Sequence, residues 1–229
     1  MKRYIELFRF PNVWVLVLSA FPARVAYGMV GLGIFFKVEQ ELNSIAIAGL
    51  AVGVNAAAGA ATAGIRGMVI DRHGMKWPLR IQVPGYALML LALNSASDKS
   101  LLLLFALLLG LTAPPINLSV RPLWRDVVSD EWLRTAYAVD TSVMSAAGVI
   151  GPVLVTTLAL SSHPGSALMV ASAAMAFGGG SLALTKICRN WIPEEKPAVK
   201  VRMWRHKPLQ LLVVEGCFIG FGWGIFDVA

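Results

Sequence analysis

The chain has 229 residues, of which 57% are hydrophobic and only 14% are charged, and its formal net charge is +7. A soluble domain carries about 25% charged residues, so this composition argues against a water-soluble globule. The basic residues lie in short segments between long apolar runs, a pattern typical of a polytopic membrane protein. The same pattern argues against a nucleic-acid partner.

Seven apolar segments each approach the roughly 20 residues that a helix needs to cross a bilayer. They span 13–36, 44–65, 79–97, 100–120, 135–160, 166–187 and 209–229. The turn residues Pro164 and Gly165 divide an uncharged stretch that is too long for one crossing. The first run is too long for the core of a signal peptide, so we predict an uncleaved first helix. The expected fold class is an all-α polytopic membrane protein.

The distribution of basic residues predicts the orientation in the membrane. Seventeen of the 20 lysines and arginines lie in four segments, namely 1–12, 66–80, 121–134 and 186–207. With seven crossings these four segments share one side, and only Lys37 and Lys99 lie on the other. By the positive-inside rule the basic side is cytoplasmic. We therefore expect a multi-pass protein of the plasma membrane with its N-terminus in the cytoplasm.

Arg24 lies about 11 residues, or roughly 16 Å, into the first predicted helix. A charge at that depth costs several kcal/mol unless it faces a partner or a water-filled cavity. Two interpretations stay open: a substrate or coupling residue lining a central cavity, or a structural ion pair inside the bundle. Asp227, on the seventh predicted helix, is a second candidate for the same pathway.

Three other polar residues in apolar surroundings are candidates for this pathway. Asn55 and Asn117 are lone amides, for which hydrogen bonds between helices are the expected role. Asp140 lies near the cytoplasmic end of the fifth predicted helix, where it either carries a proton or pairs with an arginine. Of these we favour pairing, with Arg134 or Arg121 as the partner.

No motif in the sequence indicates an enzyme. G-x-S-x-G, H-E-x-x-H and the P-loop are all absent. The two cysteines and three histidines lack the spacing of a metal site. We therefore predict a protein that is not an enzyme, with no catalytic residues, no metal and no other cofactor.

A polar island at 64–80 separates the second and third apolar segments. Its sequence follows the spacing G-x-x-x-D-R-x-G-x-K, formed by Gly67, Asp71, Arg72, Gly74 and Lys76. This spacing resembles the loop motif of the major facilitator superfamily, which lies between the second and third transmembrane helices. The predicted topology agrees with the resemblance, because it places the island in the first cytoplasmic loop.

A second stretch, in the fifth predicted helix, is similar to a Gly-Pro motif of the family's antiporter branches. Gly148, Gly151 and Pro152 carry this similarity. The family's glycine four residues before Gly151 is replaced here by Ala147.

The resemblance implies a six-helix N-terminal bundle over 1–187, a cytoplasmic linker over 188–208 and a seventh transmembrane helix over 209–229. Transporters of this family rock two six-helix bundles about a site near the bilayer midplane. One helix beyond a linker is not a bundle. We therefore expect the sequence to be a fragment whose C-terminal bundle belongs to the full-length protein.

The function implied by the resemblance is secondary active transport of a small solute by alternating access. We expect export, with the proton as the coupling ion. In members with the loop motif, its charges latch the two bundles in the outward-facing state. Asp126, in the next cytoplasmic loop, is the expected acidic partner of Arg72 and Lys76. The alternative that stays open is a non-transporting helical bundle that acts as an assembly or receptor subunit.

Overall fold

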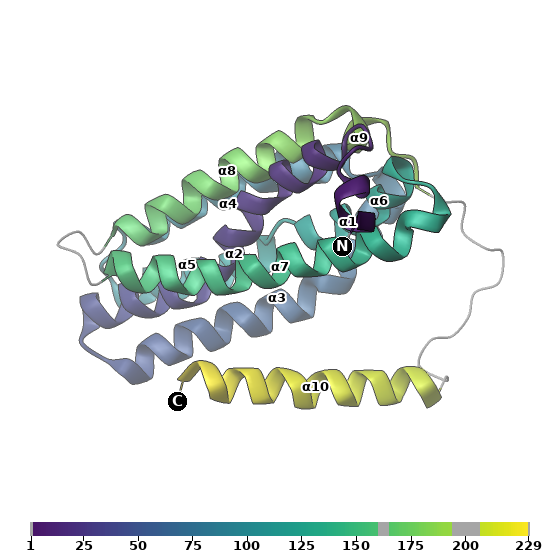
Figure 1. The fold of residues 1–229 in the computed structure, drawn as a ribbon. Helices are drawn as coiled ribbons and strands as arrows, with labels where there is room; N and C mark the ends of the chain where they lie inside the picture. The colour runs from purple at the N-terminus through teal and green to yellow at the C-terminus, as the bar shows by residue number, and fades with distance from the viewer. Residues whose placement is uncertain (1, 160–164, 194–206, 229) are drawn as a thin grey trace. The chain divides into compact units, whose positions relative to one another are not determined.

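A computed structural model describes residues 2–159, 165–193 and 207–228 of the chain, and in these ranges it contains α-helices and no strands. The helices are α1 (Lys2–Leu7), α2 (Val13–Leu42), α3 (Ile45–His73), α4 (Lys76–Ser95), α5 (Lys99–Thr112), α6 (Ile116–Val127), α7 (Asp130–Ala159), α8 (Ser166–Leu184), α9 (Lys186–Asn190) and α10 (Lys207–Val228). The long helices from α2 to α8 run side by side as a bundle (Figure 1).

The chain divides into two compact units, Met1–Pro193 and Glu194–Ala229. The first unit holds α1 to α9, and the second holds α10, a single helix of 22 residues. Most of the predicted linker, residues 194–206, lies outside the described residues, as does most of the predicted turn before Gly165. The described part of the linker includes the end of α9, a short helix that the sequence did not predict.

Five helical segments in the described part of the chain are long and apolar enough to cross a membrane. These are α2, α3, the combined segment Lys99–Val127, α7 and α8. Five of the seven predicted crossings therefore coincide with helices that are long and apolar enough to span a membrane. The two others, on α4 and α10, stay predictions. The first half of α4 contains Lys76, Arg80 and Gln82, which lower its hydropathy.

Helix α2 is the central element of the first unit. It packs against α3, α7 and α8, and also touches α5 and α6. Small side chains and glycines make these contacts close. A Cβ atom added at Gly151 of α7 would lie 2.7 Å from the Cα atom of Gly28 in α2. On the opposite side of α2, Gly178 of α8 lies against the backbone of Pro22 and Ala23.

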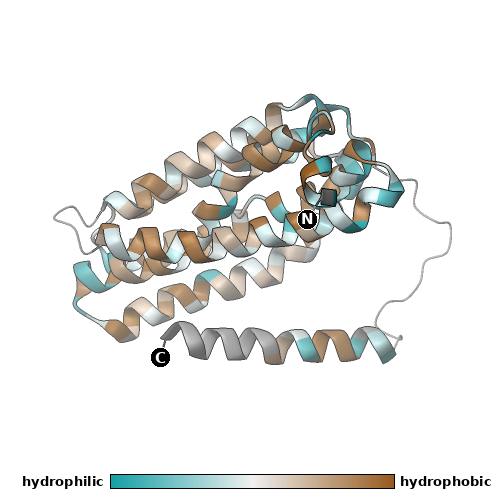
Figure 2. Cartoon of the chain, viewed as in Figure 1, coloured by the Kyte–Doolittle hydropathy of each residue, from teal (hydrophilic) through white to brown (hydrophobic). Residues whose placement is uncertain are grey.

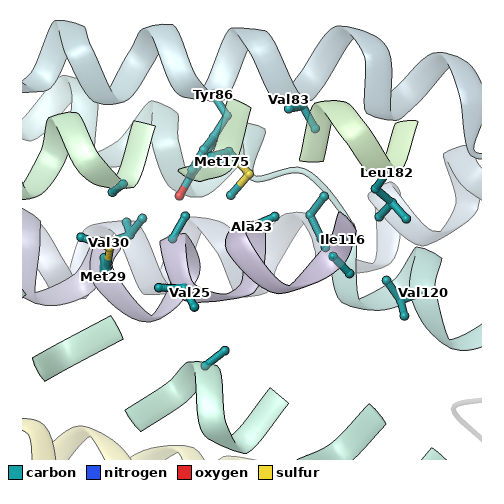
Figure 3. Close-up of a cluster of buried hydrophobic side chains, with 14 of the residues drawn as sticks. Ala23, Val25, Met29, Val30, Val83, Tyr86, Ile116, Val120, Met175 and Leu182 are labelled. Atoms are coloured by element: carbon teal, nitrogen blue, oxygen red, sulfur yellow. The ribbon is translucent and has the colours of Figure 1, made fainter. Parts of the chain in front are cut away.

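The apolar core fills the space between α2, α4 and α8. Figure 3 shows Ala23 and Met29 of α2 in the same cluster as Val83 and Tyr86 of α4 and Met175 of α8. All five side chains are buried. This packing fixes α2 against α4 and α8, so polar residues on α2 hold defined positions in the bundle.

The connection between α3 and α4 is shorter than the sequence predicted. Helix α3 continues to His73 and α4 begins at Lys76, so only Gly74 and Met75 lie between them. The prediction of a loop over 64–80 was wrong, because the backbone hydrogen bonds of α3 and α4 continue through most of these polar residues. The helix ends where Gly74 adopts a positive φ of 75° and donates its N–H to the Ile70 carbonyl.

The fourth crossing is broken in its middle, which the sequence analysis did not predict. Helix α5 ends at Thr112, and α6 begins at Ile116 after Ala113, Pro114 and Pro115. Proline has no N–H and excludes the preceding residue from helical geometry, so two prolines in succession interrupt the backbone ladder. Carbonyl groups at this break need partners from elsewhere in the bundle.

Polar residues gather at one end of the bundle (Figure 2). This end holds α1, the end of α3, the start of α4, the end of α6, the start of α7 and α9 (Figure 1). Helix α1 is fixed there by Arg3, which donates to the Glu131 carbonyl and lies over the Trp132 ring. The described parts of the basic segments in the first unit, 2–12, 66–80, 121–134 and 186–193, therefore lie at one end of the bundle.

Candidate functional site

A buried ion pair joins Arg24 of α2 to Asp140 of α7. Arg24 Nη2 lies 2.8 Å from Asp140 Oδ1, and the side chains are 3% and 11% exposed. Arg24 also donates from Nη1 to the Asp140 carbonyl at 3.4 Å and from Nε to Asn117 Oδ1 at 3.1 Å. Three transmembrane segments are therefore connected through one guanidinium group.

The prediction that Asp140 pairs with Arg134 or Arg121 was wrong. Arg121 lies over the ring of Tyr137, 5.4 Å from its centroid. Asp140 is buried on α7, which packs against α2, and the arginine that its carboxylate contacts is Arg24 of α2. The sequence identified both charges as candidates but did not connect them, because they are 116 residues apart.

The pairing makes Asp140 the one charge on which the burial of Arg24 depends. Removing one partner of a buried ion pair costs several kcal/mol, because the other charge stays buried without compensation. Loss of the Asp140 carboxylate would have this effect, because the Arg24 guanidinium stays charged. Asn117 would then be the remaining side-chain partner of Arg24.

Arg66 of α3 and Tyr27 of α2 also contact the break between α5 and α6, where they donate hydrogen bonds to its carbonyl groups. Arg66 donates from Nη1 to the Ala113 carbonyl at 2.7 Å and from Nη2 to the Gly59 carbonyl at 2.5 Å. The hydroxyl of Tyr27 donates to the Pro114 carbonyl. These two side chains satisfy carbonyl groups that the α5–α6 break removes from the helical ladder.

A cavity of about 170 Å³ lies beside this break, between α2, α3, α4 and α5. Its polar lining consists of Tyr27, Tyr86 and Asn55, together with backbone at Gly59 and Ala113. The rings of Tyr27 and Tyr86 are 6.0 Å apart. Asn55 donates from Nδ2 to the Ala106 carbonyl of α5 at 2.9 Å, which confirms the predicted hydrogen bond between helices.

Sequence analysis missed three residues of this region. Arg66 was counted among loop charges, although it lies on α3 inside the bundle. Tyr27 and Tyr86 gave no signal, because an aromatic residue in an apolar helix is usually core. The signal that was present is Pro114-Pro115 within an apolar run, since discontinuous membrane helices frequently border substrate sites.

The loop-motif residues occupy the end of α3 and the start of α4. Asp71 and Arg72 are exposed in the last turn of α3, and Lys76 lies 5.1 Å from the Trp77 ring centroid. The structure pairs neither Arg72 nor Lys76 with Asp126, as the ion pairs of the described residues are Arg24–Asp140 and Lys37–Glu41. The predicted latch pairing is thus not made here, and the latch itself stays a prediction.

The glycines of the two motifs have different environments. A Cβ atom at Gly67 or at Gly148 would meet nothing within 4 Å, so neither glycine is required by packing within the described part. Gly67 does not end the second crossing, since α3 continues six residues further, to His73. Gly151, followed by Pro152 inside α7, is the motif residue that the α2 crossing requires.

Two further predictions concern Asp227 and metal binding. Asp227 lies in α10, and its side chain is outside what the structure describes. Among the described residues, no group of three or more His, Cys, Asp or Glu side chains is arranged to hold a metal ion.

Comparison with models of protein families gives a match. A family model described as Major Facilitator Superfamily matches residues 16–227, which is nearly the whole chain. No curated protein matches the sequence. The matched range includes α2 to α10 and therefore both the buried ion pair and the broken crossing.

Proposed function

Because the chain belongs to the major facilitator superfamily, a family of secondary transporters that are generally non-enzymatic, we propose that it transports a small solute by alternating access. In this proposal residues 1–187 are the six-helix bundle, 188–208 the cytoplasmic linker and 209–229 the seventh transmembrane helix. The protein lies in the plasma membrane with a cytoplasmic N-terminus. The basic residues of 2–12, 66–80 and 121–134, Arg66 apart, lie at the end of the bundle where α1, α6 and the start of α7 meet, which supports this orientation.

The observation that carries the proposal is the buried Arg24–Asp140 ion pair beside a broken membrane helix. Ionisable residues inside the membrane are costly, and they mark ion and substrate pathways. Asn117 lies in the first turn of α6, directly after the break, and accepts from Arg24. A proton on Asp140 thus acts on the same residues that border the break.

We assign the coupling step to Asp140 and the coupling ion to the proton. In the deprotonated state, Asp140 holds Arg24 to α7. When Asp140 binds a proton, Arg24 keeps its charge and requires another anionic or polar partner. Substrate binding near α6 and proton binding at α7 then compete for one guanidinium, which is the linkage that antiport needs.

Export is the proposed direction. It rests on Gly151 and Pro152, whose motif resembles that of the antiporter branches of the family. The structure gives Gly151 a physical role, because the α2–α7 crossing that aligns Arg24 with Asp140 needs the absence of a side chain there.

The proposed conformational latch involves the residues at the α3–α4 connection and Asp126 of α6. Asp71, Arg72 and Asp126 are exposed, so they are available for contacts that form in another state. Helix α3 also presents Gly49, Gly53 and Gly67 with nothing within 4 Å of a Cβ atom, a surface that permits close approach of a second bundle.

Transport is tested in inside-out membrane vesicles that contain the chain. A panel of labelled organic acids, amines and neutral metabolites is offered with an acidic lumen. We expect one class to accumulate, to be lost when an ionophore collapses the pH gradient, and to be lost in Asp140→Asn. The matched control is Asp98→Asn, which removes a carboxylate that caps α5 through the Ser100 and Leu101 N–H groups. Absence of accumulation for every class would contradict transport and favour the non-transporting subunit.

A further inference from the structure

Arg66 is a half-buried cation without a carboxylate partner among the described residues. Its charge is permanent. The carbonyl groups of Gly59 and Ala113 hold two of its five N–H donors, and its Nε atom is buried without a hydrogen-bond partner. By contrast, Asp140 neutralises Arg24. Among the described residues, no carboxylate offsets the positive charge of Arg66.

This charge lies at the edge of the cavity between α2, α3, α4 and α5. Gly59 and Ala113, whose carbonyls Arg66 binds, both line that cavity. Arg66 is also close enough to Tyr27 and Tyr86 to interact electrostatically with both phenol groups. A molecule in the cavity is therefore in the field of the Arg66 guanidinium.

The other polar groups of the cavity favour an acceptor. The Tyr86 ring points from α4 towards α2 (Figure 3), and its hydroxyl has no hydrogen-bond partner among the described residues. The hydroxyl of Tyr27 and the amide of Asn55 are already engaged by backbone carbonyls. Since no carboxylate lines the cavity, a cationic solute would meet the charge of Arg66 with nothing to offset it.

The rest of the lining is apolar or backbone, with Val30 of α2, Leu109 of α5 and small residues of α2, α3 and α5. The volume of about 170 Å³ compares with an engineered apolar cavity of about 150 Å³ that holds one benzene molecule. The space thus suits a compact apolar body with one charged group.

We propose that this cavity binds a small organic monoanion, a carboxylate with a compact apolar or aromatic body. Its carboxylate group is held by Arg66 and by the Tyr86 hydroxyl. This assignment names the substrate class of the proposed transport function and rests on it for its biological role. Binding itself requires no transport.

Binding is measured by equilibrium dialysis on the purified chain in nanodiscs, with labelled benzoate as the anion, benzamide as the neutral isostere and benzylamine as the cation. We expect benzoate to bind at least tenfold more tightly than benzamide, and benzylamine not to bind. Equal affinities for benzoate and benzamide would overturn the proposal. This readout is independent of flux, so an anion that binds without being transported refutes the transport function and leaves the anion site in place.

Variants assign the preference to its residues. Arg66→Gln is expected to abolish the tenfold preference for benzoate, Arg66→Lys to retain most of it, and Tyr86→Phe to weaken benzoate about fivefold without affecting benzamide. The control is Arg121→Gln, which removes an exposed arginine of α6 far from the cavity lining. Tyr86→Phe removes one oxygen atom, so it keeps the test decisive if Arg66→Gln does not fold. A preference unchanged in Tyr86→Phe and in folded Arg66→Gln would contradict the site.

Discussion

Replacement of Asp140 by asparagine tests the buried ion pair at its centre. The substitution keeps the shape of the side chain and one acceptor oxygen for Arg24 Nη2, now 2.8 Å away, but removes the negative charge. Arg24 keeps its bond to Asn117 and remains buried as an uncompensated cation. Breaking a buried pair from one side costs about 3–5 kcal/mol, and the retained hydrogen bond places Asp140→Asn near the lower end, at about 3 kcal/mol.

The assay is a double-mutant cycle with Arg24→Gln and Asp140→Asn, in which unfolding by SDS in mixed micelles is followed by tryptophan fluorescence. The double variant removes both charges, so it is expected to recover most of the loss and to give a coupling energy of about 2 kcal/mol or more. The control cycle uses Lys37 and Glu41, an i,i+4 pair at the end of α2 with an expected coupling of about 0.5 kcal/mol. A coupling for Arg24 and Asp140 no larger than that of the control would refute the reasoning.

Three further predictions concern other parts of the bundle. Gly151→Val places a side chain within 3 Å of the Gly28 backbone and is expected to destabilise the bundle by about 2 kcal/mol or more. Gly148→Ala is expected to change the stability by no more than about 0.5 kcal/mol. Equal effects of the two variants in SDS unfolding would contradict the close crossing. Burial raises the pKa of the Cys188 thiol to about 11, against the opposing effect of Arg80, so the thiol is protonated at pH 7. Maleimide is therefore expected to leave Cys188 unmodified until the protein unfolds, which intact-mass measurement will show. Asp71→Asn is expected to bias the protein towards the inward-facing state and to lower transport several-fold, measured by accessibility of an introduced cysteine and by vesicle flux; wild-type values in both would exclude the latch.

The membrane class and the order of the helices follow from the sequence, because long apolar runs with few charges are compatible with few structures other than membrane-spanning helices in a chain of this length. Arg24, Asn117 and Asp140 were also identified from the sequence, since charged and amide groups are conspicuous in an apolar helix. Their mutual contact was not predicted. Sequence position gives the depth of a residue in the membrane, but which neighbour it faces depends on the rotation of each helix, and close crossings such as Gly28–Gly151 set that rotation.

The polar island at 64–80 shows that a cluster of charged residues does not by itself mark a loop. Asp71 and Arg72 belong to the last turn of α3, because only Gly74 has the backbone conformation that ends the helix. The same assumption hid Arg66, which was assigned to a cytoplasmic loop although it binds carbonyls at the centre of a broken crossing. Pro114-Pro115 marks that break in the sequence. Which side chains satisfy the freed carbonyls requires the tertiary structure.

The central claim is that the α5–α6 break, with Arg24 on one side and Arg66 on the other, borders the substrate site. Photolabelling tests it most directly, with 4-azidobenzoate bound to the chain in nanodiscs and the modified peptides identified by mass spectrometry. The account predicts that labelling concentrates on α2 around Tyr27, on α4 around Tyr86 and on the segment 109–113, and that excess benzoate abolishes it whereas benzamide does not. Labelling spread evenly over the exposed faces, or unaffected by benzoate, would contradict the claim.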